Sequence, residues 1–407
     1  MNIILIHNKY GAHSGEESVV YAQRDLLRSH GHEVEEYYRS SEEIRGVGGQ
    51  VNAFFSGFYN RTSANEIRRR TKDEGRGTKG RPDIVHIHNL YPLISPAILQ
   101  IIRKSQFTAH SSQLTVHSSP LPTSPPKIVM TVHNYRLVCP NGLYFIHGEI
   151  CEQCNGGREW NCILRNCENS LYKSTGYAAR NWWARVKRSY LDNVDAFLCL
   201  TSFQKEKLAQ NGFPPEKLHV LPNFMDAPDP GISSIETGTY AIFVGRLNRQ
   251  KGIDLLLSAA SANPDIPFKA AGEPDPVFLS QQSLPANVEL TGHLPPADLH
   301  RVVGQSRFLV FTSRSYEGFP MVFLEAMKHR LPVIAPNMAG FPEIIEGGVN
   351  GLLFNPGDAN DLAAKIRILW EDKELCSRLG HNGFMKLQEN YSPEVYYRKL
   401  MDVYNSL

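Results

Sequence analysis

The chain has 407 residues, of which 42% are hydrophobic, and this length fits two domains better than one ordinary hydrophobic core. Its 43 basic and 41 acidic residues leave a formal charge of +2. This balance provides no global field that would attract nucleic acid or an anionic membrane, so any basic site must be local.

The first ten residues hold only a short apolar run at 3–6 with no basic residue before it, which is too little for a secretory signal. No apolar run in the sequence reaches the roughly 18 residues that a membrane-spanning helix needs. We therefore expect a cytoplasmic protein, with peripheral contact at the inner face of the membrane left open. In that compartment the seven cysteines should be reduced or bound to metal, because disulfides are rare there.

Short, continuous apolar runs in the first half of the chain are typical of strands buried on both faces, and helical periodicity separates them. Such runs lie at 2–6, 84–87, 127–132 and 196–200. A proline-rich stretch at 218–238 then predicts an interdomain linker.

The same alternation restarts after the linker. The predicted strands lie at 240–244, 268–271, 288–290, 308–311, 333–335 and 352–354, and the predicted helices near 253–260, 320–329 and 358–370. The pattern predicts two doubly wound, Rossmann-like α/β domains, each presenting ligand-binding loops at the carboxyl ends of its strands.

These runs predict three parts of the chain. Residues 1–225 form an N-terminal domain with insertions near 71–81 and 107–126 and a Cys-rich insertion at 139–167. Residues 226–390 form a C-terminal domain, and 391–407 form a helix that is able to cross back to the first domain.

The most specific motif spans residues 316–326 and reads Tyr-Glu-Gly-Phe-Pro-Met-Val-Phe-Leu-Glu-Ala, with two glutamates eight positions apart. A second motif at 245–252 reads Gly-Arg-Leu-Asn-Arg-Gln-Lys-Gly between a predicted strand and a predicted helix. Together with 82–89, 131–134 and 351–358, these motifs resemble retaining glycosyltransferases of family four, also called group one, which have the GT-B fold. That resemblance implies two domains that face a central cleft, with 1–225 on the acceptor side and 226–390 as the nucleotide-sugar-binding domain.

The resemblance assigns the donor-binding side of that cleft, and the residue types fit. Arg246 and Lys251 would stabilise the charge that grows on the departing diphosphate. A predicted helix begins at Phe319, Pro320, Met321 and Val322. The backbone N–H groups at this helix end, which all of these residues except proline carry, favour the binding of an anion. Glu325 would grip the ribose hydroxyls, and Glu317 would lie near the transferred sugar.

On the N-terminal side, Gly15 takes the place of the family's glycine-rich first loop, where a backbone without Cβ approaches a phosphate closely. The paired glycines common in the family are replaced by Ser14 and Gly15. His133 matches the family's histidine at the sugar-binding edge, and we group it with Glu317, Arg246 and Lys251 as the catalytic candidates. For His86 and His88, which share one face of a strand, packing or capping is favoured.

The sequence has no Asp-x-Asp triplet of the sort that holds a divalent metal under a diphosphate. The resemblance then implies a metal-independent, retaining hexosyltransferase without a catalytic cofactor. Its donor would be a UDP or GDP sugar and its acceptor a sugar or a lipid-linked molecule, with no role for nucleic acid. A nucleotide-sugar epimerase of GT-B fold stays open as an alternative, and a zinc-containing nucleic-acid-binding protein as a remote one.

Two local patterns add further hypotheses. Cys139, Cys151, Cys154 and Cys167, with Cys162 as a substitute, have spacing suited to one structural zinc, and a set of packed thiols is the equally weighted alternative. The stretch 180–188 mixes tryptophans with basic residues and suits an anionic membrane, but we favour a helix that packs its aromatics inward.

Overall fold

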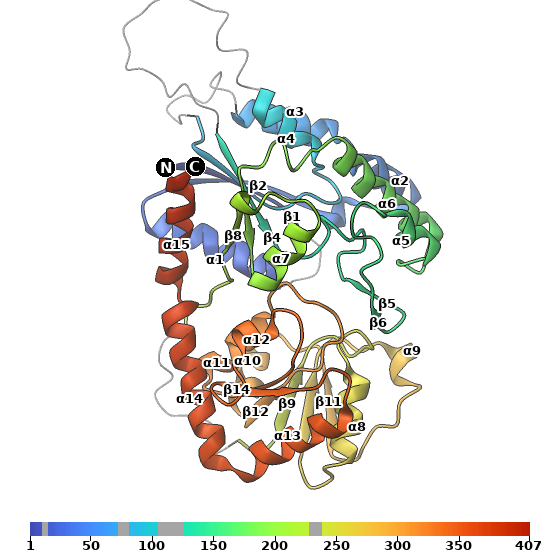
Figure 1. Ribbon diagram of the computed structural model, residues 1–407, viewed down its shortest axis with the longest axis vertical. Coiled ribbons are helices and arrows are strands. Elements are labelled where there is room, and N and C mark those ends of the chain that lie inside the picture. The colour runs from blue at the N-terminus through green and yellow to red at the C-terminus, as the bar shows by residue number, and fades with distance from the viewer. Residues whose placement is uncertain (10–14, 72–80, 105–125, 228–237) are drawn as a thin grey trace, which may run out of the picture.

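The computed structural model describes residues 1–9, 15–71, 81–104, 126–227 and 238–407. Two α/β domains lie one above the other, each built on a six-stranded sheet (Figure 1). The insertions predicted near 71–81 and 107–126 lie almost wholly outside the described residues. None of the described helices is long and apolar enough to cross a membrane.

The N-terminal sheet is entirely parallel and has the order β2-β1-β3-β4-β7-β8. Its strands are β1 (Asn2–Lys9), β2 (Glu33–Ser40), β3 (Ile84–Asn89), β4 (Lys127–Val132), β7 (Ala196–Cys199) and β8 (Leu218–Val220). The helices around it are α1 (Gly15–Ser29), α2 (Gly46–Ser56), α3 (Arg61–Thr71), α4 (Ala97–Lys104), α6 (Leu171–Val186) and α7 (Ser202–Gln210). The Cys-rich insertion adds a hairpin of β5 (Phe145–Ile146) and β6 (Glu149–Ile150) and the short helix α5 (Trp160–Leu164).

The C-terminal sheet is also parallel, in the order β11-β10-β9-β12-β13-β14. Its strands are β9 (Ala241–Val244), β10 (Phe268–Ala271), β11 (Val288–Gly292), β12 (Phe308–Val310), β13 (Val333–Pro336) and β14 (Gly351–Phe354). The helices are α8 (Ile253–Ser261), α9 (Pro276–Leu279), α10 (Pro296–Gly304), α11 (Met321–Lys328), α12 (Phe341–Ile344), α13 (Ala359–Glu371) and α14 (Lys373–Asn390).

The strand order reverses once in each sheet, between β1 and β3 in the first and between β9 and β12 in the second. The prediction of two doubly wound α/β domains is therefore confirmed. Ligands of such sheets bind beyond the carboxyl ends of the strands at the reversal point. In this chain the loops that leave those strand ends carry the predicted site residues.

Within the N-terminal sheet the sequence interpretation missed two strands, β2 and β8, and both lie at an edge. β2 reads Glu-Val-Glu-Glu-Tyr-Tyr-Arg-Ser and is mostly half-buried, so it lacks the continuous apolar run of a central strand. β8 has only three residues and lies where we expected the linker to begin. Edge strands need apolar side chains on one face at most, which weakens their sequence signal.

The C-terminal helix α15 (Pro393–Ser406) packs against the N-terminal domain, as Figure 1 shows. The Tyr396 hydroxyl donates to Gln23 Oε1 at 2.8 Å, and the Tyr404 hydroxyl lies 2.6 Å from His86 Nδ1. All four side chains are buried. The helix thereby ties the end of the chain to the core beneath β1 and β3.

A second contact between the domains caps α7. The backbone amides of Ser202 and Phe203 donate to the two carboxylate oxygens of Glu343, at 2.6 and 2.7 Å. These amides are unpaired within their own helix, so a carboxylate from α12 is a favourable partner for the positive helix end. The C-terminal domain thus provides the hydrogen-bond acceptors for the first N–H groups of a helix in the N-terminal domain.

Candidate active site

Gly318 and His133 bring the two domains into direct backbone contact. A Cβ on Gly318 would lie 2.4 Å from the carbonyl oxygen of His133, closer than any real carbon approaches. His133 follows β4 in the N-terminal domain, whereas Gly318 lies in the loop between β12 and α11. Two of the predicted motifs, distant in sequence, therefore meet at one point, and Glu317 is beside it.

Glu317 and Lys251 form an ion pair, with Lys251 Nζ 2.7 Å from Glu317 Oε1. The Lys251 side chain is 21% exposed and the Glu317 side chain 17%, so the pair is partly shielded from water but open to a ligand. Gly252 follows Lys251 with φ of 70°, and a Cβ there would lie 2.1 Å from the Thr312 carbonyl oxygen. Only glycine fits that turn, which directs the Lys251 side chain toward the 316–320 loop.

Arg246, the second predicted phosphate ligand, is exposed and lies on the same loop. Its guanidinium donates to Gln250 Oε1 at 3.1 Å, and Gln250 Nε2 in turn donates to Ser315 Oγ at 3.1 Å. The arrangement connects the 245–252 loop with the loop that carries Glu317. Besides this bond to Gln250, the exposed guanidinium has further N–H donors that can reach a ligand.

Gly15 begins α1 and lies against the start of α11. A Cβ on Gly15 would be 3.1 Å from Met321 Cγ, which leaves little room for any side chain. Phe319 and Pro320 precede Met321 and are buried, and Val322 continues the first turn. The backbone N–H groups at the start of a helix have no partner within that helix, so those of α11 can bind an anion beside Gly15.

His133 lies in a row of stacked histidines. His133 Nε2 is 2.9 Å from His88 Nδ1, and the rings of His88 and His86 stack at 4.6 Å. Burial lowers the pKa of His133 to about 3, helped by the nearby His7 and His86, and the pKa of His86 also to about 3. The imidazoles are therefore neutral at neutral pH. Because His133 Nε2 faces His88, its Nδ1 is the nitrogen left for a ligand.

The role of His88 was not foreseen from the sequence. It is 3% exposed and holds His133 by a ring-to-ring hydrogen bond, so it positions a candidate site residue. His86 behaves as the favoured interpretation expected, as a packed residue whose nitrogens meet Thr131, Gln23 and Tyr404. The sequence signal for this contact was the two-residue spacing of His86 and His88 along a strand, since it places both rings on one face of the sheet.

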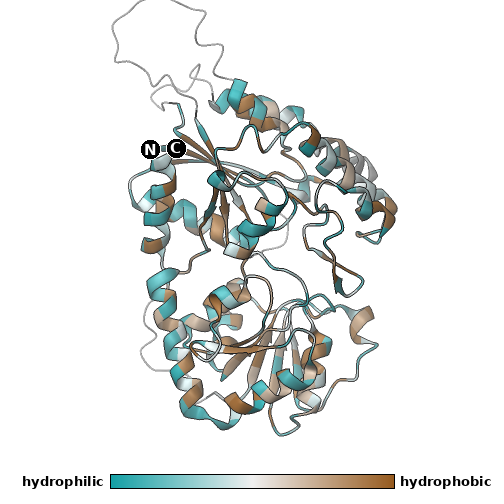
Figure 2. Cartoon of the chain, in the orientation of Figure 1, coloured by the Kyte–Doolittle hydropathy of each residue, from teal (hydrophilic) through white to brown (hydrophobic). Residues whose placement is uncertain are grey.

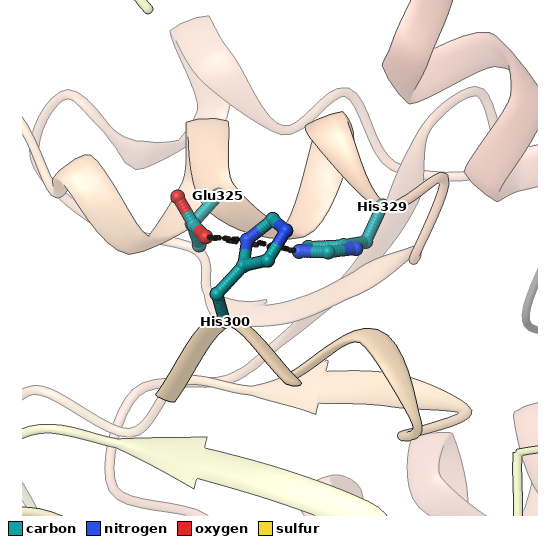
Figure 3. A group of neighbouring side chains, drawn as sticks. All are labelled: His300, Glu325 and His329. Carbon is teal, nitrogen blue, oxygen red and sulfur yellow. Dashed lines mark hydrogen bonds and ion pairs between the residues drawn. The ribbon is translucent and has the colours of Figure 1, made fainter. Parts of the chain in front are cut away.

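Glu325 lies on α11 and faces two histidines (Figure 3). Its Oε1 is 3.1 Å from His300 Nδ1 and 3.7 Å from His329 Nε2, and the two histidine nitrogens are 2.9 Å apart. Burial raises the pKa of Glu325, but the hydrogen bonds from His329 and His300 outweigh it and hold the pKa at about 2. Glu325 is therefore ionised at neutral pH, and its carboxylate oxygens can only accept hydrogen bonds. The sequence interpretation did not identify these two histidines.

The five clustered cysteines line one small cavity of about 10 Å³, together with Pro140, Asn141, Phe145 and Ile146. All are free thiols, and burial raises the pKa of Cys139 to about 11 and that of Cys154 to about 12. Among the described residues, the one group of three or more metal-ligating side chains with ligand atoms within 4.8 Å of one another is His300, Glu325 and His329. No three of these five sulfurs therefore lie within 4.8 Å of one another, whereas the sulfurs of a tetrahedral site with Zn–S bonds of about 2.3 Å lie roughly 3.8 Å apart.

Comparisons with known proteins agree with this geometry. The model for "Glycosyltransferase Family 4" matches residues 13–227, and that for "Glycosyl transferases group 1" matches residues 229–385. The first alone covers more than half of the chain. The chain belongs to glycosyltransferase family 4. The resemblance inferred from the motifs is therefore confirmed, and so is the prediction of a glycosyltransferase.

Curated relatives of this family 4 chain include an uncharacterized glycosyltransferase of Methanocaldococcus jannaschii, 32% identical over 47% of this chain and 54% of the relative. The sulfoquinovosyl transferase of Arabidopsis thaliana is 34% identical over 34% of this chain and 28% of the relative. A capsular polysaccharide biosynthesis glycosyltransferase of Staphylococcus aureus is 28% identical over 40% of this chain and 45% of the relative. The matches thus span about half or less of these relatives' lengths.

Among solved structures, an Anabaena protein in complex with UDP and glucose has a TM-score of 0.65 at 17% identity, with both chains covered in full. Sucrose-phosphate synthase from Thermosynechococcus elongatus has a TM-score of 0.66 at 17% identity and covers 100% of this chain and 98% of its own. At these identities the likeness shows the fold, and the fold is GT-B.

The structural zinc stays a prediction, which elemental analysis of untagged protein tests. We expect about one zinc per chain, because four thiolates complete a closed tetrahedral site. Cys151→Ser should lose the zinc and lower the melting temperature, since a structural metal contributes directly to folding. Cys199→Ser and Cys376→Ser, at buried cysteines outside the cavity, are the matched controls. Zinc far below one per chain, or an unchanged Cys151→Ser, leaves packed thiols as the correct description.

Proposed function

We propose that this glycosyltransferase is retaining and metal-independent, and transfers a hexose from a UDP or GDP sugar to a hydroxyl of a sugar or lipid-linked acceptor. Polysaccharide or glycolipid synthesis is the setting that we infer. One observation carries the proposal: the contact of Gly318 with His133 brings the Lys251–Glu317 pair beside the N-terminal histidine. Solved structures of similar fold that contain UDP and UDP-glucose support the donor class.

Fixed cations on the C-terminal domain are suited to the departing diphosphate. Negative charge grows on the leaving phosphate as the glycosidic bond breaks, and preorganised cations stabilise it more in the transition state than in the ground state. Lys251 supplies a compact charge, and Arg246 supplies planar donors that match phosphate oxygens. The amides at the start of α11 add a third source of positive potential.

The pairing of Lys251 with Glu317 has a further consequence. Because Glu317 holds the ammonium at 2.7 Å, Lys251 needs little reorganisation when the diphosphate arrives. The carboxylate also keeps negative charge near the sugar ring, where an oxocarbenium-like centre would form. In the proposed reaction Lys251 would stabilise the charge on the diphosphate, and Glu317 the charge on the sugar.

His133 is suited to hold a sugar hydroxyl rather than to remove a proton. Its pKa of about 3 makes it a very weak base at neutral pH, but a neutral imidazole still hydrogen-bonds. In the retaining reaction that we propose, the departing phosphate oxygen accepts the proton of the attacking hydroxyl. The chain's residues then need only to position donor and acceptor on one face.

The alternatives raised from the sequence lose their support. Family membership favours transfer over an epimerase that acts on the donor alone, although both reactions would use the same donor contacts. The cysteine cavity belongs to an insertion within the first domain, so a zinc-containing nucleic-acid binder has no separate module here.

Removing either phosphate ligand should strongly reduce transfer. We expect Lys251→Ala and Arg246→Ala each to lower kcat/KM by about 30- to 1000-fold, because loss of one such contact typically costs about 2–4 kcal/mol. Steady-state kinetics with the active sugar nucleotide measures this. Lys269→Ala breaks an exposed ion pair with Glu289 in the same domain and is the matched control. Near-normal activity of both site variants would contradict the assignment.

Loss of the ribose carboxylate should act mainly on donor binding. We expect Glu325→Ala to raise the donor KM with a smaller change in kcat, because the ribose contact is similar in the ground and transition states. His300→Ala removes one hydrogen bond to that carboxylate and should raise KM less. Glu289→Ala is the control. A donor KM that Glu325→Ala leaves unchanged would remove the ribose role.

The metal-independent and retaining parts of the proposal are tested in one assay. Initial rates should be unchanged in excess EDTA, since Lys251 and Arg246 take the place that a divalent metal has under a diphosphate. Proton NMR of early product should show the anomeric configuration of the donor. A rate that collapses and returns only with Mg²⁺ or Mn²⁺ contradicts the first part, and an inverted product contradicts the second.

A further inference from the structure

Helix α6 exposes its large apolar side chains and buries its small and polar ones. The buried positions are Ser174, Gly176, Ala178, Arg180, Asn181 and Ala184. The exposed positions include Leu171 at 63%, Tyr172 at 53%, Trp182 at 48%, Trp183 at 41% and Val186 at 51%. This is the reverse of a helix on a water-facing surface. The expectation that the aromatics of 180–188 pack inward was therefore wrong.

Two neighbouring helices extend this apolar surface. Phe54 of α2 stacks on Tyr172, and Phe58 meets Trp183 edge to face, which places the adjacent Phe55 and Tyr59 beside α6. On the other side, Cys154, Cys162 and Ala178 form a small buried cluster that joins α5 to α6. We call the resulting surface the α2–α5–α6 face; its exposed apolar residues are Phe55, Tyr59, Trp160, Leu164, Leu171, Tyr172, Trp182, Trp183 and Val186.

The composition of this face is aromatic. Among the described residues, all six exposed Phe, Tyr and Trp side chains belong to it, and they include three of the chain's four tryptophans. Figure 2 shows hydrophobic segments on these helices at the outer side of the N-terminal domain. Large exposed apolar patches mark interaction sites, and Trp and Tyr are enriched where proteins meet the headgroup layer of a bilayer.

The charge around the α2–α5–α6 face indicates which kind of partner it would bind. Residues 157–188 contain seven basic and two acidic residues, although the whole chain has a net charge of only +2. Both acidic residues are shielded: Glu159 is buried and pairs with Arg185, and Glu168 is half-buried. Lys173, Lys187 and Arg188 are exposed at the edge of the aromatic surface. Aromatic side chains ringed by cations match an anionic lipid surface.

We propose that the α2–α5–α6 face docks on a membrane that contains anionic phospholipids. The aromatic side chains enter the headgroup layer, and the surrounding lysines and arginines pair with lipid phosphates. Both contributions are needed, because each one alone gives marginal binding. The partner is thus a lipid surface, and not a second copy of this chain or another protein.

The inner side of α6 connects this face with the candidate active site. The buried Asn181 and Ala184 of α6, together with the exposed Arg185 and Arg188, line a cavity of about 60 Å³ that Arg136 also borders. Arg136 lines a second cavity, of about 30 Å³, together with His88 and His133. Docking would hold the acceptor side of the enzyme close to the bilayer, where a lipid-linked acceptor is anchored. This last step rests on the proposed function, whereas membrane binding does not.

Vesicle flotation tests the docking surface. The full-length protein should float with vesicles of phosphatidylcholine and phosphatidylglycerol, and bind vesicles of phosphatidylcholine alone much more weakly. Binding should weaken in about 1 M salt, where charges are screened beyond about 3 Å. The double variant Trp182→Ser/Trp183→Ser should bind about tenfold less tightly. Tryptophan emission should shift to shorter wavelength when the wild type meets the anionic vesicles.

Matched variants separate docking from folding and from catalysis. Val277→Ser/Leu284→Ser replaces two exposed apolar residues of the C-terminal domain and should leave flotation unchanged. Lys173→Gln/Lys187→Gln should weaken binding to anionic vesicles only. Hydrolysis of the donor without vesicles should be the same in all these variants, so a failure of docking is distinct from a failure of the proposed function. No flotation of the wild type, or a dimer in sedimentation velocity that the tryptophan variant dissociates, would overturn the proposal.

Discussion

The contact between Gly318 and the His133 carbonyl is the constraint on which the candidate site depends. No side chain fits at position 318, so the loop that follows β12 lies directly on the end of β4. Glu317 and the start of α11 are one and three residues from that point. Their place relative to the N-terminal histidines is therefore fixed by backbone, which deforms less readily than side chains do. The Glu343 cap on α7 and the packing of α15 hold the same two domains at other points.

The two domains differ in their electrostatics at this junction. The C-terminal side carries full charges: Lys251 paired with Glu317, the exposed Arg246, and Glu325 held ionised by two histidines. The N-terminal side presents neutral imidazoles, because burial holds the pKa of His133 and His86 at about 3. A charged diphosphate and a neutral sugar hydroxyl need these two different surroundings. The division of charge thus suits the proposed donor and acceptor.

The sequence predicted the central strands well, because continuous β-branched runs such as 127–132 occur only where both faces of a parallel sheet are buried. It also pointed to candidate residues after those strands, and the structure brings Lys251 close to Glu317 and His133 close to Gly318, since strand ends at one edge of a sheet meet in space. It missed the half-buried edge strand β2, and it missed His88 and His300, whose roles come from contacts with residues 45 and 25 positions away. Such pairings arise from the packing of whole elements and leave no local pattern.

Helix α6 shows most clearly why periodicity could not predict which side of a helix is buried. Its sequence has two stripes, one of small residues and one of large apolar ones, and either could have been the buried side. Gly176 decides between them: a Cβ there would lie 2.7 Å from the Phe54 ring, so only the small stripe allows α2 and α6 to approach so closely. Ala178 meets the buried cysteines in the same way. Because the side of α6 with the small residues is buried, Trp182 and Trp183 lie on its exposed side. The exposed aromatics therefore result from the close packing of the interior, and their surroundings of basic side chains suit a lipid surface.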